Sequence, residues 1–140
     1  MAQADIPVIE LEYAFSIRIN TGDSVFFQGP MRSRSYEPVA GGEIFGPRLQ
    51  GRVVAGSGAD FASNGMLDAH FMLQAADGTW IYVNQLGYEH AAEGEPYFRV
   101  TPYFDTPTGP HDWLGKTVFV GTGIRGVEPD HILYTYYALL

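Results

Sequence analysis

Alternation of apolar and polar residues is the feature that most restricts what this chain can fold into. In IELEYAFSIRIN, residues 9–20, every odd position is apolar and every even position except Ala14 is polar. A period of two residues is typical of a β-strand with one buried face, because successive side chains point to opposite sides of a sheet. We therefore predict a half-buried strand over this segment.

Seven further segments have the same strand-like composition. They are short, rich in β-branched and aromatic residues and bounded by turn formers: EIFGPRLQGRVVAG, GADFAS, MLDAHFMLQA, TWIYVNQLGY, PYFRVTPYF, KTVFVGTG and HILYTYYALL. No segment shows sustained helical periodicity. We predict an all-β fold in which residues 1–140 form a single antiparallel barrel of about eight strands with an apolar, aromatic-lined lumen. Closure removes the exposed edges that an open sheet would leave.

Two dipeptides predict which side chains share a face. We interpret Asn64-Gly65 and Asp77-Gly78 as two-residue hairpin loops. The face predicted to line the lumen then carries Asp60, Leu67, Ala69, Phe71, Leu73, Trp80, Tyr82, Asn84 and Leu86. The outer face carries Phe61, Asp68, His70, Met72, Gln74, Ile81, Val83 and Gln85. A bulge near Gly56 or Gly58 would exchange Asp60 with Phe61, and the sequence leaves that alternative open.

Residues 41–61, GGEIFGPRLQGRVVAGSGADF, contain six glycines. Each glycine inside a strand costs roughly 0.5–1 kcal/mol relative to alanine, so such a density predicts bends, bulges or close backbone approaches. Two interpretations are compatible. The glycines form corners of a barrel, or they widen its mouth beside Asp60.

Composition excludes several classes of function. The net charge of −8 disfavours nucleic acid and anionic membranes as partners, and the absence of Cys excludes thiol chemistry and disulfides. The four His residues are not spaced as metal ligands, so we predict no metal. The N-terminus lacks the basic and apolar regions of a signal peptide, and we expect a cytoplasmic location. Small molecules and further copies of the chain remain as partners, with a homodimer expected first.

Arg99 is the most informative cation. It lies in the middle of the predicted strand YFRVT, and a buried guanidinium needs a carboxylate partner. That partner is either Asp60 or Asp68, in a structural pair, or an acid group of the substrate. We predict a catalytic set of Asp60 as proton acceptor, Tyr82 at the substrate oxygen and Arg99 holding an anionic group. The predicted substrate-binding wall consists of Phe71, Trp80, Asn84 and Tyr103.

Four blocks of the sequence point to a known family. GGEIFGPRLQGRVVAGSGADF, DGTWIYVNQLG, YFRVTPYFDT and WLGKTVFVGTG, in this order, resemble a bacterial and fungal family known mainly as a domain of unknown function. The resemblance implies a small antiparallel β-barrel, and some relatives are thought to act on lignin-type aromatic acids without a cofactor. The chain departs from the family pattern at Phe61, where an indole is common, and at His70, Asn84 and Tyr103, where Arg is common. Fewer cations at these places either argue against a strongly anionic ligand or shift the place where its charge is held.

Two hypotheses of function follow. In the first, the protein is an enzyme without a cofactor, a lyase or decarboxylase acting on a phenolic or aromatic acid through Tyr and Asp acid–base chemistry. In the second, the barrel binds a small apolar or aromatic ligand without catalysis. Two or more titratable groups that converge in the lumen favour the enzyme, whereas a lone hydrogen-bonding group favours the carrier.

Overall fold

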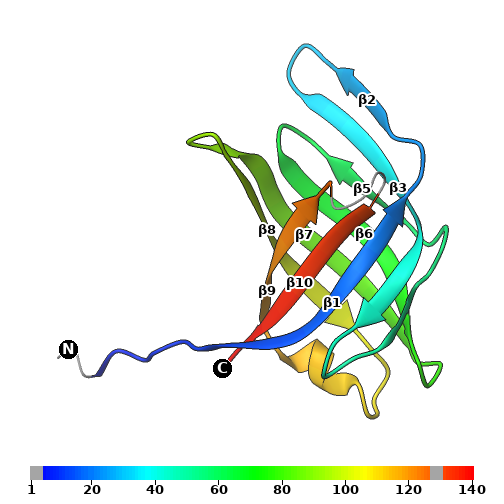
Figure 1. The fold of residues 1–140 in the computed structure, drawn as a ribbon, viewed down its shortest axis with the longest axis vertical. Helices are drawn as coiled ribbons and strands as arrows, with labels where there is room; N and C mark the ends of the chain where they lie inside the picture. The colour runs from blue at the N-terminus through cyan, green and yellow to red at the C-terminus, as the bar shows by residue number, and fades with distance from the viewer. Residues whose placement is uncertain (1–4, 127–130) are drawn as a thin grey trace.

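The computed structural model describes residues 5–126 and 131–140, which form a strongly curved antiparallel sheet (Figure 1). Residues 1–4 and 127–130, which the predicted domain 1–140 includes, lie outside the described residues. The strands are β1 (Leu11–Thr21), β2 (Val25–Gln28), β3 (Ser33–Phe45), β4 (Gly51–Val53), β5 (Ala59–Ala62), β6 (Met66–Ala75), β7 (Trp80–Ala92), β8 (Glu95–Asp105), β9 (Phe119–Arg125) and β10 (His131–Leu139). A short 3₁₀-helix, η2 (Asp112–Lys116), precedes β9. No helix in the described ranges is long and apolar enough to cross a membrane.

The sheet closes on itself through β1, which pairs with β10 on one side and with β3 on the other. β4 and β5 both pair with β3 and β6, so they are successive halves of one interrupted strand. β2 pairs with β3 and forms with it a hairpin that projects beyond the barrel (Figure 1). The predicted closed antiparallel barrel of about eight strands is confirmed.

The alternation in β1 predicts its inner face correctly over the second half of the strand. Phe15, Ile17 and Ile19 are buried in the lumen, whereas Leu11 and Tyr13 are exposed. The pairing of β1 with β10 shifts register between Tyr13 and Phe15, which marks a β-bulge. Ala14, which interrupts the alternation in the sequence, lies at this bulge, because the extra residue there exchanges the two faces.

One end of the lumen is filled by aromatic side chains. Phe15, Phe104, Phe119 and Tyr136 are almost completely buried and pack against one another. Phe104 meets Phe119 edge to face, with 5.2 Å between the ring centroids. Helix η2 covers this end and buries Leu114 (Figure 1). A functional site inside the barrel therefore lies toward the opposite end, which we call the mouth.

The first predicted hairpin loop is confirmed and the second is wrong. Asn64 and Gly65 have positive φ, 51° and 80°, and Ser63 pairs with Met66 across a two-residue loop. At the second turn the N–H of Ala75 donates to the carbonyl of Thr79, so residues 76–78 form a three-residue loop. The added residue shifts the register of β7 by one and exchanges its faces.

Close contact between strands explains the glycine-rich segment. A Cβ on Gly58 would lie 1.7 Å from the carbonyl oxygen of His70 on the neighbouring strand. Gly42 has φ of +150°, and a Cβ there would lie 1.9 Å from the carbonyl oxygen of Arg18. Glycine is needed at both positions because the strands approach each other too closely for any side chain.

We predict that Gly58→Ala lowers the free energy of unfolding by roughly 1–3 kcal/mol, the usual effect of forcing extra volume into a packed interior. Urea unfolding monitored by circular dichroism measures the loss. Gly115→Ala is the matched control, because its added Cβ would make an ordinary contact at 3.5 Å. Equal stabilities of the two variants would contradict this account of the segment.

Candidate functional site

Five polar side chains from five strands lie together at the mouth of the barrel, and we call them the mouth cluster. They are Glu37 on β3, Asp60 on β5, Glu89 on β7, Arg125 on β9 and Tyr134 on β10. The pairing registers place them on the inner face, since Glu37 is opposite Asp60, Glu89 is opposite buried Phe98, and Arg125 is opposite buried Ile132. No group of three His, Asp or Glu side chains among the described residues is arranged to hold a metal ion.

Arg125 holds the two glutamates of the cluster in place. Its Nη1 and Nη2 donate to the two carboxylate oxygens of Glu37, each at 3.1 Å, and its Nε donates to Glu89 at 2.6 Å. Burial alone would lower the pKa of Arg125, but the hydrogen bonds that it donates to Glu89 and Glu37 raise the pKa above its ordinary value. The guanidinium is therefore permanently charged, and all three of its nitrogens are already used on protein carboxylates.

Asp60 is the third carboxylate of the mouth, and no cation bonds to it directly. It lies opposite Ala69 on the inner face, and its Oδ1 accepts a hydrogen bond from the backbone N–H of Asp68 at 3.1 Å. Burial, assisted by the negative charge of Glu37, raises the pKa of Asp60 to about 6. This carboxyl can therefore both give and take a proton near neutral pH.

Tyr134 is almost completely buried, at 4% exposure, and lies close enough to Asp60 to feel its charge. Its ring packs edge to face on Phe98, with the centroids 5.5 Å apart. Its hydroxyl has no hydrogen-bond partner among the residues that the structure describes. Burial, and next the negative charge of Asp60, raise the pKa of Tyr134 well above its ordinary value. The phenol therefore stays protonated and has a hydrogen bond to offer.

An opening between β8 and β9 exposes Glu89 and Arg125 of the mouth cluster, whereas Glu37, Asp60 and Tyr134 do not line it. These strands pair only at Arg99–Thr122 and Val100–Gly121 and diverge toward the mouth. The gap forms a pocket of about 420 Å³, within the size range of small-molecule sites. Its lining residues are Glu89, Pro96, Phe98, Arg99, Thr122, Gly123, Ile124 and Arg125. A Cβ on Gly123 would meet the Phe98 ring at 2.7 Å, so this glycine makes room for the ring that lines the pocket.

The structure separates the predicted site residues. Asp60 faces inward, as predicted, and Phe71 also faces inward but lies in the packed core at 2% exposure. The shifted register of β7 puts Trp80, Tyr82 and Asn84 on the outer face, opposite Gln74, Met72 and His70 respectively. The predicted convergence of Asp60, Tyr82 and Arg99 on one cavity therefore does not occur.

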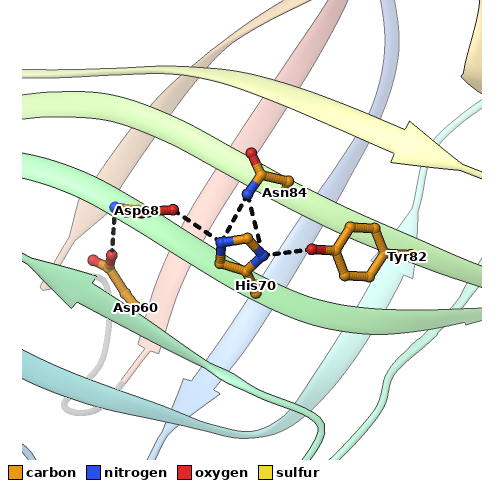
Figure 2. A network of polar contacts seen from close by, with 5 residues as sticks. All are labelled: Asp60, Asp68, His70, Tyr82 and Asn84. Atoms are coloured by element: carbon orange, nitrogen blue, oxygen red, sulfur yellow. Dashed lines mark hydrogen bonds and ion pairs between the residues drawn. The ribbon is translucent and has the colours of Figure 1, made fainter.

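The outward residues of β6 and β7 form a polar network of their own, which Figure 2 shows. His70 lies at its centre, with Nε2 3.1 Å from Oδ1 of Asp68 and Nδ1 2.5 Å from the hydroxyl of Tyr82. The side-chain nitrogen of Asn84 lies 2.8 Å from Nε2 of the same imidazole. Asp60 joins this network only through the backbone N–H of Asp68 (Figure 2).

Arg99 and Tyr103 also face outward from β8, where the buried positions are Phe98, Val100, Pro102 and Phe104. Nη1 of Arg99 donates to the carbonyl of Phe98 at 3.0 Å, and its guanidinium lies 5.3 Å from the centroid of the Tyr97 ring. Within the described residues it forms no ion pair. The structural pair with Asp60 or Asp68, one of the two alternatives for Arg99, is therefore not formed.

Sequence reasoning missed Glu37, Glu89 and Arg125. Arg125 continues the inner positions Phe119, Gly121 and Gly123 of β9. Glu89 continues the inner positions of β7. The β-branched residues Ile81 and Val83 on the same face indicated that this face is buried. The Asp-Gly dipeptide outweighed this signal, since it suits two-residue and three-residue hairpin loops alike.

We predict that Asp60→Asn stabilises the protein above pH 6, because a desolvated charge is removed. Because the folded-state pKa of Asp60 is raised, protonated Asp60 makes its full contribution to the free energy of unfolding below about pH 4. That contribution is lost as the pH rises through about 6. Thermal unfolding should show a gain on the order of 1–3 kcal/mol at pH 8 that disappears near pH 4. Asp105→Asn, an exposed carboxyl on the outer face of β8, should show no such pH-dependent gain. A gain from Asp60→Asn that is the same at both pH values would contradict this assignment.

Comparison with known proteins places these features in a family. The profile described as "Protein of unknown function (DUF3237)" matches residues 9–139. The chain is 30% identical over 118 residues to the "Hydroalkoxylation enzyme phnH" of Penicillium herquei, covering 80% of this chain and 72% of that protein. A crystal structure of a beta-barrel like protein from Acinetobacter baumannii AYE has a TM-score of 0.87 at 25% identity, over 99% of this chain and 100% of that one. A crystal structure of an enzyme from Penicillium herquei has a TM-score of 0.79 at 23% identity, over 97% of this chain and 98% of that one. At this identity the likeness shows the fold alone. The chain belongs to the DUF3237 family, and one of its relatives is named a hydroalkoxylation enzyme.

Proposed function

We propose that the protein is an acid–base enzyme that forms or breaks a carbon–oxygen bond in a neutral phenolic molecule bound at the mouth of the barrel. The observation that carries the proposal is the Asp60 carboxyl, whose pKa is raised to about 6, among the charged groups of an open mouth. The relative named a hydroalkoxylation enzyme supports the same class, since that reaction adds the O–H of an alcohol across a carbon–carbon double bond. The reverse elimination is a lyase reaction.

The charge of the mouth favours a neutral substrate over an acid. Three carboxylates surround a single guanidinium, and both Glu37 and Glu89 already bond to it. A substrate carboxylate beside Asp60 would meet net negative charge. Arg99, which borders the pocket and forms no ion pair within the described residues, faces outward from β8. Decarboxylation of an aromatic acid, the other branch of the predicted chemistry, therefore has little support. A reaction that develops positive charge on the substrate fits this environment better.

One carboxyl is sufficient for the proton transfers of such an addition. Protonated Asp60 gives its proton to the terminal carbon of an alkene side chain, and the double bond breaks as the new C–H bond forms. The neighbouring carbon becomes electron-deficient and is stabilised by the negative mouth. The phenol oxygen then bonds to that carbon, and its O–H proton goes to the Asp60 carboxylate. Substrate and product are isomers, and Asp60 ends in its starting form.

Tyr134 has the chemistry to position the oxygen of the substrate. Its hydroxyl stays protonated and has no hydrogen-bond partner among the described residues, so it can donate to the oxygen that attacks. The Phe98 ring beside it offers an apolar, aromatic wall for the substrate ring. Several titratable groups thus converge at the mouth, which favours an enzyme over a barrel that only binds an apolar ligand.

The test uses ortho-methallylphenol, which can close to the isomeric gem-dimethyl dihydrobenzofuran. We expect conversion by the wild-type protein, with one deuterium in a methyl group of the product when the reaction is run in D₂O. The rate should fall about tenfold per pH unit above about 6, because the acid form of Asp60 is required. Liquid chromatography and NMR measure the product.

Variants assign the chemistry to the mouth. Asp60→Asn should lower the rate by about 10²-fold or more, the usual contribution of a general acid. Tyr134→Phe should raise the KM more than it lowers kcat, because it removes a hydrogen bond that positions the substrate. Asp68→Asn, a carboxyl on the outer face two residues from His70, serves as the control and should keep the wild-type rate. Conversion that survives Asp60→Asn, or binding of the phenol without conversion at any pH, would contradict the proposal.

A further inference from the structure

A second hollow lies on the outside of the barrel, and we call it the outer groove. It has a volume of about 670 Å³ and crosses the outer faces of β7 to β10. Its lining is mostly apolar, and several of these side chains are exposed although they are large: Leu11, Met66, Leu86, Tyr88 and Tyr97. Gathered apolar side chains on a surface mark a place where another molecule binds.

The charge of the outer groove differs from that of the chain as a whole. The chain has a net charge of −8, yet none of the residues that line the groove is acidic, and Arg99 lies among them. Arg99 has no carboxylate partner within the described residues, as noted above. The groove therefore suits an apolar segment that carries a negative charge.

Residues 5–10, DIPVIE, have this composition, and we call them the N-terminal arm. Residues 5–9 run away from the barrel at the side where β8 and β9 lie (Figure 1), whereas the carbonyl of Glu10 accepts a hydrogen bond from the N–H of Leu140 at 2.9 Å. Val8 is 81% exposed and Ile9 is 65% exposed, which is unusual for such side chains in a folded protein. Asp5 and Glu10 flank the apolar residues. Pro7 restricts the backbone of the arm and so lowers the entropy lost when the arm binds.

We propose that the N-terminal arm of a second copy of the chain binds in the outer groove, and that the two copies exchange arms about a two-fold axis. Leu11 lines the groove and directly follows the arm, so each arm leaves the barrel at the edge of its own groove. A two-fold axis beside this edge brings each arm to the groove of the other copy. An extended segment of six residues spans roughly 20 Å.

The exchange buries the apolar residues of the N-terminal arm and those of the outer groove together. Val8 and Ile9 are removed from water against the apolar lining, and an acidic residue of the arm comes near Arg99. In an isologous interface the same contacts form twice, so each gain is doubled.

A rival surface is the β2–β3 hairpin, where Phe26, Phe27 and Met31 are exposed. It lies at the mouth end of the barrel (Figure 1), whereas the outer groove follows the side. Neither hollow described above includes a residue of this hairpin. The two surfaces are far enough apart in the fold to be tested separately.

Sedimentation velocity of the full chain at micromolar concentration distinguishes a dimer formed through the N-terminal arm from one formed through the β2–β3 hairpin. We expect a dimer for the wild type, at least tenfold weaker association for Val8→Asp, and unchanged association for Met31→Asp. Both positions are more than 80% exposed, so neither change should affect folding. A monomeric wild type, or a dimer that Met31→Asp dissociates and Val8→Asp does not, would overturn the proposal.

Cross-linking tests the contact directly, because the chain has no Cys. We expect a disulfide-linked dimer when Val8→Cys and Thr101→Cys variants are mixed and oxidised, since Thr101 lines the groove. The control is a mixture of the Val8→Cys and Glu43→Cys variants, since Glu43 is an exposed position on β3. This mixture should not form a disulfide-linked dimer. Equal cross-linking in both mixtures would show that the arm does not select the groove.

Discussion

The pairing of β1 with both β10 and β3 is the contact on which the rest of the structure depends, because it turns a sheet into a closed barrel. Closure fixes an inside and an outside, and every strand then presents alternate residues to each. It also limits the inside to a narrow lumen, which large aromatic side chains fill at the end covered by η2. Space for a ligand is left where the strands separate, as β8 and β9 do near the mouth.

The mouth is an unfavourable place for charge, and its arrangement shows how the fold accommodates this. Glu37 and Glu89 bond to one guanidinium, which compensates for their partial burial. Asp60 has no such partner, and burial raises its pKa to about 6. Groups that destabilise a fold in this way are frequent at functional sites, because the same environment that costs stability makes a proton easy to transfer. We infer function at the mouth from this imbalance.

The inner and outer faces of the barrel serve different purposes in our interpretation. The inner face at the mouth supplies acid–base groups beside an aromatic wall. The outer face along β8 and β9 carries an apolar groove with one unpaired cation, which suits an acidic and apolar segment of another copy. Arg99 illustrates the division. The strand that presents Phe98 to the lumen necessarily presents Arg99 to the outside.

The sequence alone determined the β-rich fold, the inner face of β6 and the turn at Asn64-Gly65, because each follows from local periodicity or turn chemistry. It left the choice between Asp60 and Phe61 open, and the pairing of β5 with β3 and β6 decided that Asp60 faces inward. Tertiary structure decided which polar groups meet at the mouth. Asp77-Gly78 fits two loop lengths, and the packing of Ile81 and Val83 in the core is consistent with the longer one. A shift of one residue exchanges the faces of a strand, so Tyr82 faces solvent and Glu89 faces the lumen. Arg125, Glu37 and Asp60 are far apart in sequence, and only the closed barrel brings them together.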